Sequence, residues 1–202
     1  MAQVHNLAAD VRAFTSNVFL VEGDRTVLVD AGANFDVVER LEQHLDDGDG
    51  DRAALDAVLL THTHPDHIDN LDSVRDAFDV ETWGFDPTYP QVDHGIADGE
   101  TVQIGDYEYV ALHTPGHKDD HLCFYGREAG VLFAGDLVFQ NGSYGRTDLE
   151  EGNHRLLVES IELLLEELDE EFDVMHAGHG PSVSGEPYGD VELAAKMARS
   201  AQ

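Results

Sequence analysis

The chain has 202 residues, of which 42 are acidic and 11 are basic, so its net charge is −31 at pH 7. A surface this acidic repels the phosphates of nucleic acids and anionic membranes, which makes both of them poor partners. It also destabilises a compact state in low salt, whereas at molar salt the screening length falls to about 3 Å. We therefore expect a protein of a very salty cytoplasm, that of an extreme halophile, and the alternative is simply an acidic soluble protein.

The length suits one large domain, and we expect residues 1–202 to form a single domain without a linker. The chain has one cysteine, Cys123, which excludes an internal disulfide, and its apolar neighbours predict a buried side chain. We find no run of about 18 apolar residues and no basic start before an apolar segment. These features favour a cytoplasmic protein.

The first part of the chain predicts short strands and then a helix. Two apolar runs at residues 18–21 and 26–29 flank a glycine-containing turn and indicate a β-hairpin. Apolar residues at helical spacing predict a helix over residues 36–45. An acidic loop at residues 46–52 separates this helix from a strand at residues 57–60.

Beyond that strand we expect a helix over residues 65–78 and then a turn-rich surface loop over residues 83–99. Two hairpins follow, with strands at residues 101–104, 107–112, 122–125 and 131–134. A long helix over residues 153–168, a strand before His179 and a closing helix over residues 190–199 complete the predicted order.

Four candidate metal ligands fall within six residues after the strand at 57–60: His62, His64, Asp66 and His67. An extended strand end places His62 and His64 on the same side, because alternate side chains share a face. Pro65 fits the first turn of a helix, where its missing N–H costs nothing. The spacing predicts a metal site at this strand-to-helix corner, and the alternative is a set of histidines that only make hydrogen bonds.

Three further candidate ligands each follow an apolar run and a glycine or proline turn: His117, Asp136 and His179. Each turn alone is more often only a turn, but the repeated order of strand, turn and ligand favours a common site. With the corner they make five histidines and two aspartates, which is too many for one tetrahedral ion and suits two. Such ligands without thiolate suit zinc, and also iron or manganese.

This pattern resembles the metallo-β-lactamase fold superfamily, and within it the glyoxalase II-like hydrolases. The resemblance rests on the H-x-H-x-D-H motif and on four stretches spread over nearly the whole chain. These are Asn17-Val18-Phe19-Leu20-Val21, Val29-Asp30-Ala31-Gly32, Thr114-Pro115-Gly116-His117 and Gly145-Arg146-Thr147-Asp148-Leu149. It implies an α/β fold of four layers, an αββα sandwich of two mixed β-sheets flanked by helices. A faint repeat of element order between residues 17–64 and 122–179 agrees with this fold.

Carried over residue by residue, the resemblance implies two divalent metal ions, with zinc as the first choice. One ion would be held by His62, His64 and His117, and the other by Asp66, His67 and His179, with Asp136 bridging them. A hydroxide shared by the ions would attack an acyl carbonyl. Asp66 is the expected catalytic residue, because it would orient this hydroxide.

The resemblance also assigns supporting residues. Asp30 is expected to hydrogen-bond a ligand histidine and fix its tautomer, and the alternative is a turn aspartate. Arg146, and with a weaker signal Tyr144, are candidates for substrate binding, since related thioesterases carry a basic group there for an anionic thiol. The alternative for Arg146 is an ion pair with Asp148. Three other histidines near the site loops are interpreted as structural: His113, His121 and His176.

The first expectation is hydrolysis of a small-molecule thioester of a low-molecular-weight thiol. The chain ends soon after His179, so we expect no counterpart of the helical C-terminal domain of longer glyoxalase II enzymes, and a more promiscuous thioesterase. The alternative is a mononuclear iron persulfide dioxygenase that uses a motif histidine, His117 and Asp136. Other hydrolases of the superfamily rank next, and a metal-binding module without catalysis ranks last. β-Lactam hydrolysis is disfavoured, because a lactamase cysteine ligand would lie near Asp136, unlike Cys123.

Overall fold

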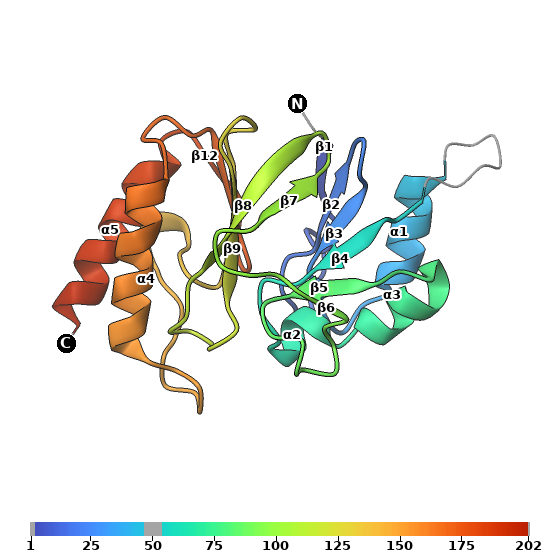
Figure 1. Cartoon of the computed structure of the whole chain (residues 1–202), viewed down its shortest axis with the longest axis horizontal. Helices are drawn as coiled ribbons and strands as arrows, with labels where there is room; N and C mark the ends of the chain where they lie inside the picture. Colours follow the sequence, from blue (N-terminus) through green and yellow to red (C-terminus); the bar gives the residue numbers. More distant parts are fainter. Residues whose placement is uncertain (1–2, 47–53, 202) are drawn as a thin grey trace.

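The computed structural model describes residues 3–46 and 54–201. They form two β-sheets of six strands each, with helices on both outer sides (Figure 1). The first sheet has the strand order β1-β2-β3-β4-β5-β6, and the second has the order β12-β11-β10-β9-β8-β7. The expected α/β sandwich of two mixed sheets flanked by helices is therefore confirmed.

The first sheet combines an antiparallel and a parallel part. Its strands are β1 (Gln3–Asn6), β2 (Phe19–Glu22), β3 (Val27–Val29), β4 (Ala57–Leu59), β5 (Thr82–Gly84) and β6 (His94–Gly95). Strands β1 to β3 pair antiparallel, and β3 to β6 pair parallel. Helices α1 (Val37–Leu45), α2 (Pro65–Ile68) and α3 (Leu71–Phe78) lie in the connections between the parallel strands.

The second sheet is antiparallel except for one pair. Its strands are β7 (Thr101–Ile104), β8 (Tyr107–His113), β9 (Leu122–Gly126), β10 (Val131–Gly135), β11 (Val174–Ala177) and β12 (Val183–Ser184). Strands β10 and β11 pair parallel. The short 3₁₀ helix η1 (Gln140–Gly142) and helix α4 (His154–Glu167) connect them, and α5 (Pro187–Ser200) ends the described chain.

Apolar packing joins these layers in the order that the four-layer fold requires. One buried cluster fills the space between the sheets and includes Phe19 from β2, Phe124 from β9 and Phe133 from β10. A second lies between the first sheet and α1 and α3, and a third between the second sheet and α4 and α5. No helix within residues 3–46 and 54–201 is both long and apolar enough to cross a bilayer.

Most of the expected elements are present, with two corrections. The helix expected over residues 65–78 is two helices, because the backbone N–H of Asn70 donates to Gly32 O (3.0 Å) outside the helix. The surface loop expected over residues 83–99 contains β6 and most of β5, which extend the first sheet; these strands are too short to leave a periodic signal. The acidic loop expected at 46–52 lies, apart from Asp46, outside the described residues.

The topology brings the ends of several strands to one edge of the sandwich. Strands β8, β10 and β11 of the second sheet run in the same direction, so their carboxyl ends share an edge. Backbone hydrogen bonds join this edge to the first sheet, from Asn17 N to Gly178 O (2.7 Å) and from Leu122 N to Thr61 O (2.7 Å). Loops from both sheets therefore meet at this edge, which we call the seam.

Candidate metal centre

The first group of candidate ligands follows β4. The extended backbone of His64 (φ −68°, ψ 146°) precedes α2, and Pro65 occupies the start of that helix as expected. His62 Nε2 then lies 3.1 Å from His64 Nδ1. Asp66 and His67 lie in the single turn of α2. The strand-to-helix corner therefore directs its ligands toward the seam.

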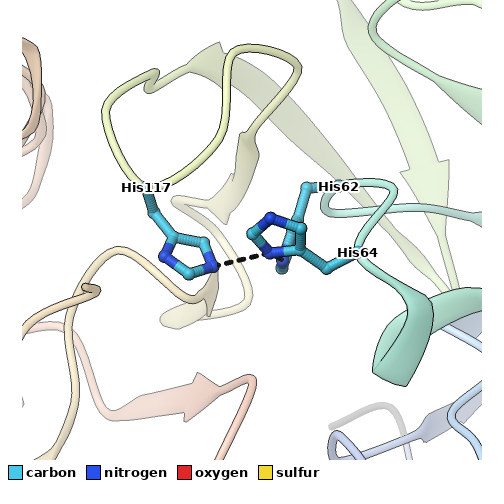
Figure 2. Close-up of side chains that lie close together, drawn as sticks. All are labelled: His62, His64 and His117. Atoms are coloured by element: carbon cyan, nitrogen blue, oxygen red, sulfur yellow. Dashed lines mark hydrogen bonds between the residues drawn. The ribbon is translucent and has the colours of Figure 1, made fainter. Parts of the chain in front are cut away.

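The second group comes from three loops of the other sheet. His117 follows β8, Asp136 follows β10, and His179 follows β11. His117 Nε2 lies 2.9 Å from His64 Nδ1, and Figure 2 shows the two rings facing each other from separate loops. His179 Nε2 lies 3.0 Å from Asp66 Oδ2. The structure thus brings together all seven candidate ligands, although they are spread over more than half of the sequence.

Asp136 lies among imidazoles that the resemblance assigns to two different ions. Its Oδ1 is 3.5 Å from His67 Nε2, and its Oδ2 is 3.4 Å from His117 Nε2 and 3.5 Å from His179 Nε2. One carboxylate therefore faces His117 of one expected set and His67 and His179 of the other, which is where the resemblance expects a bridging ligand.

The donor atoms have the spacing that a cation requires. Three groups have all their ligand atoms within 4.8 Å of one another: His62, His64 and His117; His62, His67 and Asp136; and Asp66, His67 and His179. Two nitrogens on one tetrahedral zinc ion lie about 3.3 Å apart, given Zn–N bonds of about 2.05 Å. Among the described residues, buried His67 Nε2 and Asp136 Oδ1 have no hydrogen-bond partner, although buried polar atoms usually have one. The residues present therefore fit metal ions.

The four imidazoles of the corner and of His179 differ in protonation. Burial lowers the pKa of His62 well below its usual value and lowers the pKa of His64 to about 4. Burial opposes the charge of His67 too, but the carboxylates of Asp30 and Asp136 outweigh it and raise its pKa to about 10. In the same way, hydrogen bonds to Asp136 and Asp66 outweigh burial and raise the pKa of His179 to about 9. At neutral pH a cation would displace protons from His67 and His179, but none from His62 and His64.

The structure places Asp30 beside His67. Asp30 Oδ2 lies 2.8 Å from His67 Nδ1, and the two carboxylate oxygens also accept from the backbone N–H (2.8 Å) and the hydroxyl (2.7 Å) of Thr61. The contact favours the proton on Nδ1 of His67 and leaves Nε2 facing Asp136. His117 has a similar support, since its Nδ1 lies 2.8 Å from the carbonyl oxygen of Arg146.

The two candidate substrate residues line a cavity over the ligands. The cavity measures about 530 Å³, and both Tyr144 and Arg146 belong to its lining. The Arg146 side chain donates from Nε (2.7 Å) and another guanidinium nitrogen (2.8 Å) to the two oxygens of Asp148. The ion pair weighed as the alternative for Arg146 is therefore present.

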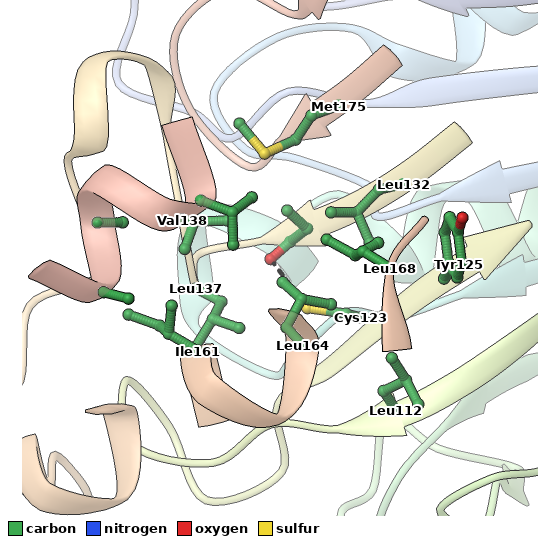
Figure 3. Packing of buried hydrophobic residues seen from close by; sticks show 14 of the residues in the cluster. Leu112, Cys123, Tyr125, Leu132, Leu137, Val138, Ile161, Leu164, Leu168 and Met175 are labelled. Atoms are coloured by element: carbon green, nitrogen blue, oxygen red, sulfur yellow. Dashed lines mark hydrogen bonds between the residues drawn. The ribbon is translucent and has the colours of Figure 1, made fainter. Parts of the chain in front are cut away.

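His121, which was interpreted as structural, holds the backbone of a candidate ligand, a partner that the sequence did not predict. Its ring is fully buried, and its Nε2 accepts a hydrogen bond from the backbone N–H of Asp136 (2.9 Å). The proton therefore lies on Nδ1, which donates to Thr114 Oγ1 (2.8 Å). Thr114 contacts the sulfur of Cys123 (3.4 Å), which packs among Leu132, Leu137 and Leu164 in Figure 3. The one feature of the sequence that could have indicated this contact is the position of His121, four residues after the candidate ligand His117.

Lys118 was also missed. Its side chain is only 4% exposed and lies near the carboxylates of Asp119 (3.1 Å), Asp120 (3.4 Å) and Glu151 (3.2 Å). Asp120 in turn accepts a hydrogen bond from the hydroxyl of Thr63 (2.7 Å). Because Thr63 lies between two candidate ligands, this network ties the corner to the His117 loop.

The other two histidines that were interpreted as structural lie outside the ligand cluster. His113 stacks on Phe85 with ring centroids 3.7 Å apart, and its Nε2 lies 2.8 Å from Asp119 O. His176 contacts Phe19 and Phe133, and its Nδ1 lies 2.7 Å from Ser182 Oγ.

Comparison with known proteins places this chain among metal-dependent hydrolases. The family described as the Metallo-beta-lactamase superfamily matches residues 11–179. Hydroxyacylglutathione hydrolase GloC of Haemophilus influenzae is 31% identical over 194 residues, which cover 84% of this chain and 88% of the relative. A longer hydroxyacylglutathione hydrolase, from Hydrogenovibrio crunogenus, is 36% identical over 121 residues; these cover 58% of this chain but only 41% of the relative.

Two solved structures share the architecture at 28% sequence identity. One is the BLEG-1 B3 metallo-beta-lactamase, with a TM-score of 0.72 over 93% of this chain and 99% of that chain. The other is TTHA1623 in a di-iron-bound form, with a TM-score of 0.70 over 90% of this chain and 92% of that chain.

Proposed function

This chain belongs to the metallo-β-lactamase superfamily as a metal-dependent hydrolase, and we propose that it cleaves thioesters of small thiols at a site for two divalent metal ions. The observation that carries the proposal is the position of Asp136 between two sets of imidazole ligands. The 31% identity to a hydroxyacylglutathione hydrolase supports the thioester, and the di-iron form of a structural relative supports two ions.

In this proposal each sheet contributes ligands to both ions. One ion would be held by His62, His64 and His117, and the other by Asp66, His67 and His179, with Asp136 shared between them. Zinc is the first choice, because each ion would have only a few protein ligands and these are imidazoles and carboxylates. Iron or manganese would also suit this ligand set. When bound, the ions would polarise the acyl carbonyl and lower the pKa of a water to about 7.

The protein's own residues would orient the reactants. Asp66 is half-buried at the cavity, so we assign it the role of holding the attacking water toward the carbonyl. Asp30 would keep His67 in one tautomer, and Tyr144 and Arg146 would contact the substrate from the cavity wall. Cys123 is unsuited as a nucleophile, because burial in the core raises the pKa of its thiol to about 12.

The test combines metal analysis with thiol release. Protein purified in molar KCl should contain two transition-metal ions per chain and should release free thiol from an acyl thioester, as water replaces the thiol on the acyl carbon. His64→Ala should lose metal and reduce kcat/KM by at least about 100-fold. His113→Ala is the matched control, because its ring lies outside the ligand cluster.

Three outcomes would overturn the proposal. Full metal occupancy in His64→Ala would contradict the site. One iron per chain with oxygen uptake on a persulfide would support the dioxygenase alternative instead. Faster cleavage of a chromogenic cephalosporin than of any thioester would place the activity with that of the B3 metallo-beta-lactamase relative.

A further inference from the structure

The cavity over the candidate ligands is bounded by large apolar and aromatic side chains. Those in its lining are Phe14, Pro65, Phe139, Tyr144 and Leu149. Phe14 precedes β2, Pro65 begins α2, and the other three lie in the connection between β10 and α4. A substrate that enters the cavity therefore meets apolar side chains from both halves of the chain.

Phe14 is the most exposed of these residues. Its side chain is 74% exposed, yet its ring stacks on His179 with centroids 5.8 Å apart and an angle of 19° between the ring planes. Phe139 approaches the same imidazole at 6.4 Å. Leu149 is 38% exposed and lines the cavity from the connection between β10 and α4. Exposed apolar side chains gathered around a polar cleft mark a surface that binds a ligand.

The charged side chains around the cavity do not favour an anionic thiol group. Within the described lining, Arg146 is the single lysine or arginine, and its guanidinium is paired with both oxygens of Asp148. Lys118, the next residue after His117, is enclosed by three carboxylates and is almost fully buried. The net charge of −31 adds a long-range repulsion of anions at low salt.

On the basis of the proposed thioesterase function, we propose that this site selects thioesters whose acyl and thiol groups are uncharged, with an apolar and preferably aromatic acyl group, and that Phe14 sets this preference. The aromatic acyl group would lie against Phe14 and Phe139, where it removes apolar surface from water. Apart from the proposed metal ions, which would face the thioester carbonyl, the described lining offers a thioester of an anionic thiol such as glutathione no uncompensated cation. The side chains that line the cavity, and not the metal ligands, would therefore determine the class of substrate.

The first experiment compares thioesters that differ in one group at a time. The acyl group is acetyl, butanoyl or phenylacetyl on the uncharged thiol N-acetylcysteamine, and acetyl or phenylacetyl on glutathione. We expect kcat/KM to be about 30-fold higher for phenylacetyl than for acetyl. We also expect N-acetylcysteamine thioesters to exceed glutathione thioesters in both 0.2 M and 2 M KCl, because salt screens the long-range repulsion and leaves the cavity walls unchanged.

Variants test the part of Phe14. Phe14→Ala should reduce the ratio of phenylacetyl to acetyl kcat/KM by roughly tenfold. Met197→Ala is the matched control, since this α5 residue is 46% exposed and lies outside the cavity lining, and it should keep the ratio of the wild type. An unchanged ratio in Phe14→Ala would overturn the assignment of Phe14.

Binding of uncleavable analogues separates this inference from the proposed function. Ketones in which a methylene replaces the thioester sulfur are titrated calorimetrically in the acetyl and phenylacetyl forms. Tighter binding of the phenylacetyl ketone by at least about tenfold supports the apolar site, even if no thioester is cleaved and the proposed function fails. Equal affinities, no binding up to millimolar concentration, or tighter binding of glutathione-based ketones would overturn the inference.

Discussion

The backbone N–H of Asp136 donates a 2.9 Å hydrogen bond to Nε2 of His121, a ring that is fully buried. Gly135 makes this contact feasible, because a Cβ at that position would lie 2.5 Å from His121 Nε2. The bond fixes the loop that carries Asp136 against the second sheet. His121 therefore acts as a positioning residue for the carboxylate between the two ligand groups.

A pair of substitutions tests this role. The side-chain oxygen of His121→Gln extends far enough to accept from Asp136 N, whereas the shorter side chain of His121→Asn leaves that N–H unsatisfied at a cost of about 1–3 kcal/mol. We expect His121→Asn to lower metal affinity by about 10–100-fold and His121→Gln to recover part of it. Metal titration of both variants checks this. Equal metal affinity in the two variants, with only a loss of stability, would show a purely structural histidine.

Proton release should distinguish the two ligand groups. The pKa of His67 is raised to about 10 and that of His179 to about 9, so at pH 7 both rings are protonated and must lose a proton when a cation binds. The lowered pKa values of His62 and His64 mean that these rings release none. The affinity of the group of Asp66, His67 and His179 should therefore rise as the pH rises from 7 to 9.

Calorimetry in buffers of different ionisation enthalpy measures this release. We expect about two protons from His67 and His179 together for the ion that they bind. Asp30→Asn should reduce the number, because it removes one of the carboxylates that raise the pKa of His67. An affinity for both ions that is independent of pH between 7 and 9 would contradict the protonation described here.

Gly178 controls the space beside Asp136. A Cβ at this position would lie 2.1 Å from Asp136 Oδ1 and 2.9 Å from His67 Cε1. Gly178→Ala should therefore displace the carboxylate, destabilise the fold by about 1–3 kcal/mol and impair metal binding. Gly189→Ala is the control, because a Cβ there meets nothing within 4 Å in helix α5, and it should stabilise the protein by up to about 1 kcal/mol. Chemical unfolding and metal analysis of both variants measure these effects. Normal stability and full metal content in Gly178→Ala would contradict the prediction.

Salt should stabilise this protein through screening. With a net charge of −31, the melting temperature should rise with KCl, mostly below about 1 M, where the screening length falls from about 10 Å at 0.1 M to about 3 Å. Sucrose at matched osmolarity is the control, since it is excluded from the surface but does not screen charge. A melting temperature that does not respond to KCl, or that responds equally to sucrose, would count against the screening argument.

The sequence was most informative where a local motif carried the information. The two-residue spacing of His62 and His64 and the proline after them predicted the corner, and each downstream ligand followed a strand and a turn. The buried position of Cys123 also followed from its apolar neighbours. These features depend on a few adjacent residues, so periodicity and turn chemistry were enough to predict them.

What the sequence did not predict depends on contacts between distant residues. The burial of Lys118 involves Tyr89, whose hydroxyl it contacts at 3.1 Å, and Glu151, and neither is near it in sequence. The break between α2 and α3 depends on Gly32, 38 positions before Asn70. Strand β6 has two residues, too few for an alternating pattern. Such features become visible only when the two sheets are in place.

The seam has a consequence for how the chain holds together. Four of the candidate ligands follow β4 of the first sheet, and three follow strands of the second, so neither half could complete a coordination shell alone. A chelator that removed the ions would then abolish the activity and would also weaken the attachment between the two halves. Resistance to proteolysis should therefore increase with the number of ions bound. Refolding in the presence of metal should give a protein whose two halves are held together more stably.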